Sequence, residues 1–171
     1  SFAFVYSIRR LGIMDIQYME LALQQAETAY RLGEVPIGAV IVRENEVIST
    51  GYNMRDTQKN ALLHAETVAI HRACQKLGGW QLWQCELYVT VEPCPMCAGA
   101  IINSRIRSVY YGAKNPKAGC CESVVNLFEL PFNHKPNVTG GILEDRCGKI
   151  MTDFFTQLRE KRKLQKQCKN Q

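Results

Sequence analysis

Three side chains in the middle of the sequence have the types and the order of a zinc site. His64 comes first, and Cys94 and Cys97 follow as a Cys-x-x-Cys pair directly after Pro93. Thiolates and neutral imidazoles are ligands that zinc prefers, and a Cys-x-x-Cys pair at a helix start directs both sulfurs to one point. Structural zinc sites use four protein ligands, whereas catalytic sites leave one position to water. Three ligands therefore predict a catalytic zinc site.

Glu66 lies two positions after His64 and predicts the chemistry of that site. Zinc lowers the pKa of a bound water to about 7, so that hydroxide is available to attack an electron-poor ring carbon. Release of ammonia then requires a carboxylate that carries a proton to the ring and amine nitrogens without binding the metal. His-x-Glu followed by Pro-Cys-x-x-Cys is a signature of zinc deaminases. We predict that Glu66 is the catalytic proton shuttle.

The other histidines and cysteines provide no obvious fourth ligand. His71 lies nearly two helical turns beyond His64, and His134 lies in a predicted loop. The eight cysteines are an even number, which would suit a disulfide-stapled secreted domain. An ordinary core composition, the Cys-x-x-Cys pair beside a proline and no visible secretory signal instead favour free thiols in a reducing compartment. We therefore predict a cytoplasmic protein.

The spacing of apolar residues predicts alternating helices and strands around these side chains. Asp15 is the expected N-cap of the first helix, and a basic run follows the apolar stripe of the last. His64 and Glu66 should lie in the first turn of one helix, and Cys94 and Cys97 at a junction between strand and helix. Helices are expected over 15–33, 62–77, 96–104, 124–130 and from 143 onward, and strands over 35–42, 47–51, 86–91, 107–112 and 138–143.

This order of elements predicts the α/β class, with three layers (α/β/α) and a mixed five-stranded sheet flanked by helices. At 171 residues, 46% of them hydrophobic, the chain has the size of one domain, which we assign to residues 14–171. Residues 1–13 are expected to be a non-native or disordered N-terminal extension, with Met14 as the natural start. No apolar run approaches the roughly 20 residues that cross a bilayer, so no membrane association is expected.

Positive charge gathers at the C-terminal end of the chain. The net charge is +5, and the segment 159–169 holds one acid, Glu160, against six basic residues: Arg159, Lys161, Arg162, Lys163, Lys166 and Lys169. Such a run binds polyanions through release of their counterions. It is equally typical of a solvated segment that keeps a protein in solution, and charge alone favours neither interpretation.

The sequence from Met14 onward resembles the cytidine-deaminase-like superfamily and, within it, the bacterial tRNA-specific adenosine deaminases. The resemblance covers nearly the whole chain and does not depend on the metal motif alone. It extends over Gly33-Glu34-Val35-Pro36-Ile37-Gly38-Ala39, Gly51-Tyr52-Asn53, Thr90-Val91-Glu92-Pro93-Cys94-Pro95-Met96-Cys97, Phe132-Asn133-His134 and Phe154-Phe155 before Leu158-Arg159.

The resemblance implies conversion of the wobble adenosine of a tRNA, expected to be arginine tRNA, to inosine. It implies one Zn²⁺ per subunit, a homodimer, and the tRNA anticodon stem-loop as partner, with the nucleotide flipped into the pocket. By position, Asn53 would contact the bound nucleoside, and Ala65 would offer its backbone N–H to the base. Arg159, Arg162 and Lys163 are then candidate RNA-binding residues in the basic run.

One residue departs from the family pattern. Asn115 lies where many relatives carry Asp, in the loop Gly112-Ala113-Lys114-Asn115-Pro116-Lys117. A carboxylate there would accept a hydrogen bond from a ribose hydroxyl and repel phosphates. We therefore predict weaker discrimination between RNA and DNA sugars than in a relative with Asp. The pair Cys120-Cys121 has no assigned role, and a structural one is favoured over a functional one.

Two other functions use the same residues. A deaminase of free cytosine, cytidine or guanine would need the same zinc chemistry, although a small neutral base gains nothing from a basic C-terminal helix. A non-catalytic zinc module that binds RNA would need a closed metal site and no role for Glu66. Ammonia release from free nucleosides tests the first alternative, and the activity of a Glu66→Ala variant tests the second.

Overall fold

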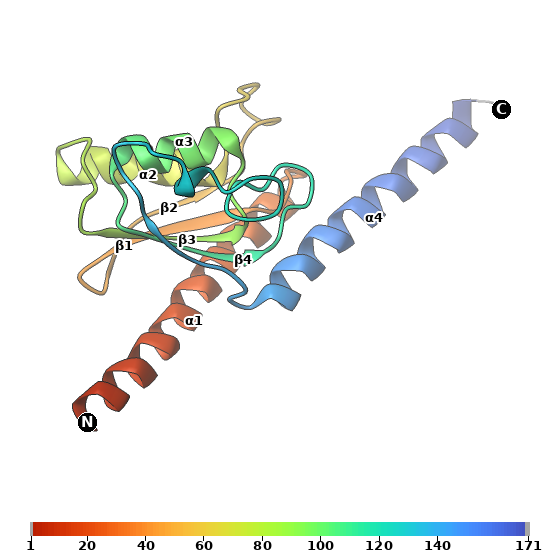
Figure 1. The fold of residues 1–171 in the computed structure, drawn as a ribbon. Coiled ribbons are helices and arrows are strands. Elements are labelled where there is room, and N and C mark those ends of the chain that lie inside the picture. Colours follow the sequence, from red (N-terminus) through yellow and green to blue (C-terminus); the bar gives the residue numbers. More distant parts are fainter. Residues whose placement is uncertain (1, 170–171) are drawn as a thin grey trace.

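The computed structural model describes the backbone of residues 2–169 and the side chains of residues 12 and 15–168 (Figure 1). Five strands form one mixed sheet in the order β2-β1-β3-β4-β5. β1 is antiparallel to both β2 and β3, whereas β3, β4 and β5 run parallel. The strands are β1 (Gly38–Arg43), β2 (Glu46–Tyr52), β3 (Cys85–Val91), β4 (Ser108–Ala113) and β5 (Asn137–Thr139).

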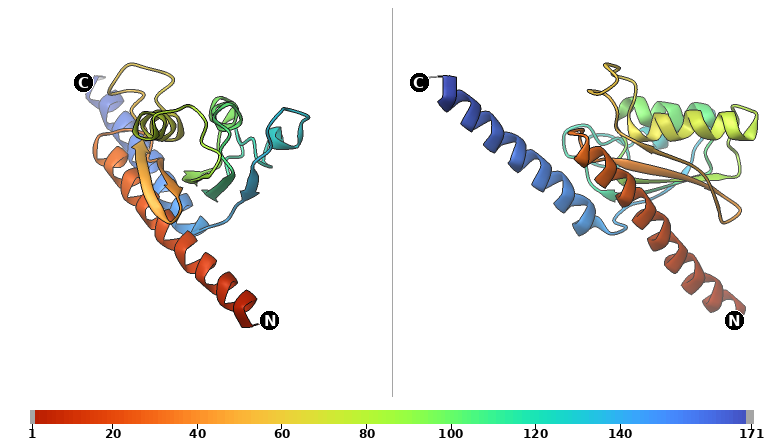
Figure 2. Two further views of the ribbon diagram at one scale, coloured as in Figure 1. Left: turned by 90° about the vertical axis from the view of Figure 1, so that its left-hand side faces the viewer. Right: turned by 180° about the vertical axis from the view of Figure 1, so that it is seen from behind.

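Helices cover both faces of the sheet. The start of α4 packs with α1 against one face, and α2 and α3 cover the other, beside the 3-10 turn η1 (Figures 1 and 2). The predicted three-layer α/β/α architecture with a mixed five-stranded sheet is thereby confirmed. The helices are α1 (Phe2–Arg31), α2 (Ala65–Leu77), α3 (Pro95–Ser104) and α4 (Glu144–Lys169), and η1 is Leu127–Glu129.

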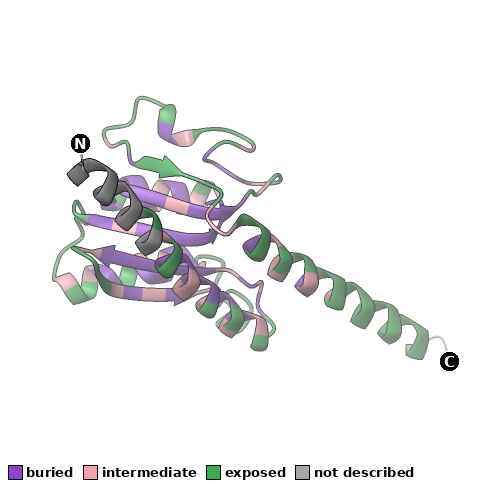
Figure 3. Cartoon of the chain, turned by 90° about the horizontal axis from the view of Figure 1, so that it is seen from below, coloured by how far each residue is buried: buried purple, intermediate pink, exposed green. Residues whose placement is uncertain are grey.

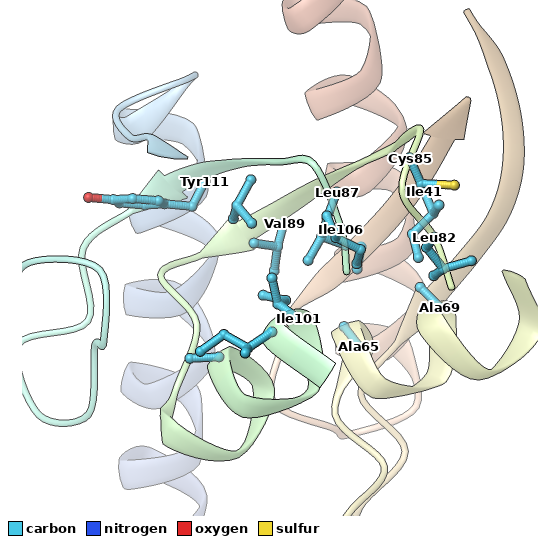
Figure 4. Packing of buried hydrophobic residues seen from close by; sticks show 14 of the residues in the cluster. Ile41, Ala65, Ala69, Leu82, Cys85, Leu87, Val89, Ile101, Ile106 and Tyr111 are labelled. Carbon is cyan, nitrogen blue, oxygen red and sulfur yellow. The ribbon is translucent and has the colours of Figure 1, made fainter. Parts of the chain in front are cut away.

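Strand alternation divides the core into two layers. Ile41, Leu87 and Val89 point toward α2 and α3, where they meet Ile101 (Figure 4). Their neighbours along the strands point the other way, into the layer under α1 and α4, where Tyr88 is 1% exposed. Strands buried on both faces read as continuous apolar runs, as β1 and β3 do.

Gly51 in β2 lets the start of α2 lie directly on the sheet. A Cβ atom at this position would lie 2.3 Å from the Ala65 carbonyl oxygen and 2.8 Å from the Ala69 backbone nitrogen. No residue larger than glycine fits that separation without displacing the helix. Because Ala65 lies between His64 and Glu66, this contact fixes the part of α2 that bears the predicted site.

Several element boundaries differ from the sequence prediction. The first helix begins at Phe2, so Asp15 is not its N-cap and lies within the helix. The Asp15 carboxylate instead accepts a hydrogen bond from the buried Tyr88 hydroxyl (2.6 Å). The strand predicted over 35–42 begins only at Gly38, so residues 35–37 precede β1. Where a helix was predicted over 124–130, the chain forms only the short 3-10 turn η1. β5 has only three residues, and Gly141 (φ 87°) and Leu143 (φ 52°) adopt left-handed conformations between it and α4. The assignment of residues 1–13 to an extension stays a prediction, and Ser1 lies outside the described residues.

The second half of α4 projects beyond the sheet and the other helices (Figures 1 and 2). Its residues 159–168 are all exposed, as the uniform colour of this part in Figure 3 shows. Residues 159–168 of the basic run therefore form a solvent-facing arm of a continuous helix. Within residues 2–169, no helix combines the length and the apolar character needed to cross a membrane.

Candidate metal centre and active site

His64, Cys94 and Cys97 converge from two helix starts. His64 is the N-cap of α2, and Cys94 is the N-cap of α3, where Pro95 sets the first helical position. The His64 Nδ1 lies 3.6 Å from each of the two sulfurs. One ligand atom from each residue lies within 4.8 Å of the others, and in the described part of the chain no further His, Cys, Asp or Glu joins this group.

These three atoms fit zinc. A tetrahedral ion at about 2.3 Å from sulfur and about 2.0 Å from nitrogen would separate the two kinds of atom by about 3.5 Å. The observed separation of 3.6 Å matches this geometry without any movement of the helices. Two thiolates and one imidazole leave one coordination position for a non-protein ligand, as in catalytic sites.

Electrostatics within the group favour a thiolate at Cys94. The hydrogen bond from the Cys97 thiol lowers the pKa of Cys94 to about 4 against the opposing effect of burial, and the His64 imidazole lowers it further. Its place at a helix N-terminus acts in the same direction. The hydrogen bond to Cys94 in turn raises the pKa of His64. Metal binding requires deprotonated sulfurs, so Cys94 is already prepared for it.

Glu66 lies in the first turn of α2 and is 4% exposed. Burial raises the pKa of its carboxyl to about 7, and the negative charge of Cys94 acts in the same direction. A carboxyl group with a pKa near neutrality can both take up and give up a proton at physiological pH. Glu66 is therefore poised for proton transfer, and it stands outside the group of candidate metal ligands.

Asn53 and Ala65 are both buried, and Ala65 directly follows His64. Asn53 directly follows β2 and is 3% exposed; its backbone N–H donates to the Ile37 carbonyl oxygen (3.2 Å). Its side-chain oxygen has no hydrogen-bond partner in the described part of the chain. Ala65 is fully buried. An unpartnered buried acceptor suits contact with a ligand, and the roles predicted for both residues stay predictions.

Asn115 lies half-buried at the start of the loop 115–123, which follows β4. Its side-chain oxygen accepts a hydrogen bond from the Ala118 N–H (3.2 Å), and its backbone N–H donates to Glu92 (2.9 Å). Part of its side chain is thus engaged within its own loop. Asn115 also lines a cavity of about 650 Å³ together with Arg159, Phe155 and Met151 of α4.

Arg162 and Lys163 do not share that cavity. Both lie further along α4 on the exposed arm, whereas Arg159 lies where the helix leaves the body. The structure thus brings one of the three predicted RNA-binding residues together with Asn115. The other two face solvent, and their contact with RNA stays a prediction.

The remaining histidines lie outside the candidate metal group, as predicted. His71 is exposed on α2. The His134 Nε2 lies 2.6 Å from the Ile106 carbonyl oxygen, and its ring packs against Trp83. All eight cysteines are free thiols, and Cys120 and Cys121 are buried.

Sequence reasoning missed two buried carboxylates near the site. Glu34 is fully buried, and one of its oxygens accepts the Thr57 N–H (2.6 Å) from the loop that joins Asn53 to His64. Glu92, which precedes Pro93, is buried under the loop that follows Asn115. Burial raises the pKa of Glu92, but hydrogen bonds from the Asn115 N–H and from other donors outweigh it, so the pKa is lowered. Both residues lie within motifs shared with the family, and nothing else in the sequence indicates that they are buried near the site.

Comparisons with known proteins agree with this geometry. A family model described as MafB19-like deaminase matches residues 13–159. The tRNA-specific adenosine deaminase of Bacillus subtilis (strain 168) is 47% identical over 150 residues, which cover 87% of this chain and 93% of the relative.

Two solved structures are similar in fold and sequence. One, from biochemical and structural studies of A-to-I editing by tRNA:A34 deaminases at the wobble position of transfer RNA, has a TM-score of 0.77 at 44% identity, and the match covers 78% of this chain and 98% of that one. A guanine deaminase from Bacillus subtilis has a TM-score of 0.55 at 40% identity, over 57% of this chain and 63% of the other. The family resemblance predicted from the sequence is confirmed. The chain belongs to the MafB19-like deaminases and, among them, to the tRNA-specific adenosine deaminases.

Proposed function

We propose that this protein hydrolyses the wobble adenosine of a tRNA anticodon to inosine and ammonia. The observation that carries the proposal is a buried Glu66 whose pKa is raised to about 7, beside a His64, Cys94 and Cys97 group with zinc-ligand spacing. The high identity to tRNA-specific adenosine deaminases supports tRNA as the substrate. Arginine tRNA is the specific substrate that we propose.

His64, Cys94 and Cys97 would hold one Zn²⁺ per subunit. The ion, when bound, would supply the Lewis-acid chemistry that makes water a nucleophile at neutral pH. Every proton in the reaction is then moved by the protein. The adenine ring must be flipped out of the anticodon stack to reach a site at this depth.

Glu66 carries the proton through the reaction. Its carboxylate takes a proton from the attacking water and gives it to a ring nitrogen as the new C–O bond forms. A second transfer, from the added hydroxyl to the exocyclic amine, lets the C–N bond break, with the electron pair leaving on ammonia. Adenosine and water thus yield inosine and ammonia, and Glu66 returns to its starting state.

The surrounding residues would orient the nucleoside. The unpartnered side-chain oxygen of Asn53 can accept a hydrogen bond from it, and the backbone N–H of Ala65 would donate to the base. Asn115 would lie near the sugar, and Arg159, Arg162 and Lys163 would contact RNA phosphates. We further propose that the protein acts as a homodimer in the cytoplasm.

The test compares substrates and one variant. Inosine formation at the first anticodon position of an arginine tRNA stem-loop should be catalysed by the wild type, and free adenosine, cytidine and guanine should release little ammonia. Turnover of the free compounds alone would instead favour a nucleobase deaminase, an alternative supported by the guanine deaminase match.

Glu66→Gln keeps the shape of the side chain but removes the acid and base. We expect kcat to fall by about 10² to 10⁴-fold, the usual contribution of a general acid or base, with unchanged zinc content. Retained inosine formation would overturn the catalytic role of Glu66 and would favour the interpretation of a zinc module that binds RNA.

A further inference from the structure

Glu92 is a buried carboxylate that the proposed chemistry does not use. It lies between the end of β3 and Pro93, and it is 1% exposed. Its side chain forms no ion pair with any of the described cations. A charge in that position needs strong hydrogen bonds in place of water.

Five donors from a single loop surround this carboxylate. Oε1 accepts three consecutive backbone N–H groups, from Cys121 (3.0 Å), Glu122 (2.8 Å) and Ser123 (3.0 Å). Oε2 accepts the backbone N–H of Asn115 (2.9 Å) and the Ser123 hydroxyl. Hydrogen bonds to a charged acceptor are stronger than those between neutral groups. The carboxylate therefore joins both ends of the loop 115–123 to the turn that precedes Cys94.

The backbone of Glu92 and Pro93 is hydrogen-bonded to the end of β4 and to the same loop. The Glu92 N–H donates to the Ala113 carbonyl oxygen (2.8 Å), and the Cys120 N–H donates to the Pro93 carbonyl oxygen (2.9 Å). Gly119 lies so close that a Cβ atom there would be 2.3 Å from the Glu92 carboxyl carbon. The loop is shaped around this one side chain, and its position relative to Cys94 is fixed there.

We infer that Glu92 is a positioning residue for substrate binding, which holds Asn115 at a set place relative to Cys94 and Cys97. The loop lines the cavity that Asn115 shares with Arg159, so a shift of the loop would alter the surface that meets the nucleotide. Glu92 itself contacts the loop and not the reacting atoms. This inference rests on the proposed function, because it assigns Glu92 to the same site.

Glu92→Gln tests the inference, because the amide keeps the shape of the side chain. Its oxygen can still accept the three N–H groups of residues 121–123, but its NH₂ group then faces the Asn115 N–H, so this bond is lost. We expect KM for the anticodon stem-loop to rise about tenfold, kcat to stay within about threefold, and the zinc content to be unchanged. The matched control is Glu86→Gln at the other end of β3, whose ion pair with Arg107 is a surface contact and whose loss should leave both constants within about twofold.

A double-mutant cycle with Asn115→Ala shows whether Glu92 acts through Asn115. If it does, Glu92→Gln should raise KM in the wild type but have little further effect in the Asn115→Ala background. An equal rise in both backgrounds, or a loss of kcat and zinc with KM unchanged, would overturn the inference.

The inference about Glu92 can fail while the proposed function stands, and the measurements distinguish that case from a failure of the proposed function. If Glu92→Gln does not fold, Glu92→Asp, which withdraws the carboxylate by one methylene, is put through the same cycle with the same expected results. A wild type that forms no inosine would overturn the proposed function, and this inference with it. An active wild type whose KM is unaffected by both Glu92 variants would overturn the inference alone.

Discussion

Substitution of Gly51 by alanine should displace the helix that carries the site. The new Cβ atom would lie 2.3 Å from the Ala65 carbonyl oxygen, whereas ordinary van der Waals contact begins at 3.4 Å. The start of α2 would therefore have to retreat by about 1 Å. Overpacking of this kind typically costs about 1–3 kcal/mol of unfolding free energy. A displacement of about 1 Å can also cost about 10²-fold in rate, since His64 and Glu66 would move with the helix.

Gly99 offers a matched control on the neighbouring helix. It lies within α3, and a Cβ atom there would meet no other atom within 4 Å. Gly99→Ala should therefore raise the unfolding free energy by about 0.5–1 kcal/mol, because alanine loses less backbone entropy in a helix.

Urea unfolding followed by circular dichroism and single-turnover inosine formation measure the two effects. We expect a lower unfolding free energy and a slower chemical step for Gly51→Ala, and neither loss for Gly99→Ala. If Gly51→Ala unfolds at the same urea concentration as the wild type and reacts at the same rate, then the close contact of β2 with α2 does not fix the position of that helix.

Three other predictions concern the metal, the sugar and the charged arm. Treatment with a zinc chelator should abolish inosine formation and lower the melting temperature, and added zinc should restore both, because a ligand bound only to the folded state stabilises it; restored folding without restored activity would contradict a catalytic metal. Asn115→Asp should raise the ratio of activity on RNA over matched DNA hairpins, and an unchanged ratio would refute the predicted sugar contact. Replacing Arg159, Arg162 and Lys163 together by glutamine should reduce the salt slope of log K for stem-loop binding by about 2 to 3, since each phosphate contact contributes about 0.7 to 0.9; an unchanged slope would place these side chains away from the RNA.

The sequence predicted the candidate metal group and the layers largely from local patterns. The spacing of Cys94 and Cys97 directs two sulfurs from one helix start, and the apolar runs of β1 and β3 show strands buried on both faces. The match of His64 to the same point follows from the order of strand and helix in this fold. The Cys-x-x-Cys pair and the apolar runs each lie within a few residues of the feature that they predict, whereas His64 joins the two sulfurs from 30 and 33 residues away.

Features that depend on distant contacts could not be predicted in this way. Aspartate is a residue type favoured at N-caps, which is why Asp15 was predicted to begin the helix. Its carboxylate instead accepts a hydrogen bond from the buried Tyr88 hydroxyl, and the helix continues through it. Glu92 resembles an ordinary charged residue next to a proline until the loop 115–123 folds over it. Glu34 is similar, because its partner Thr57 is supplied by a different loop.

X-ray absorption at the zinc edge of the purified, zinc-loaded protein would show whether the metal site keeps a position for a non-protein ligand. We expect one ion with two sulfur neighbours at about 2.3 Å and two nitrogen or oxygen neighbours at about 2.0–2.2 Å, from His64 and one non-protein ligand. Three or four sulfur neighbours would mean that Cys120 or Cys121 closes the site, which would contradict a catalytic centre with an open position.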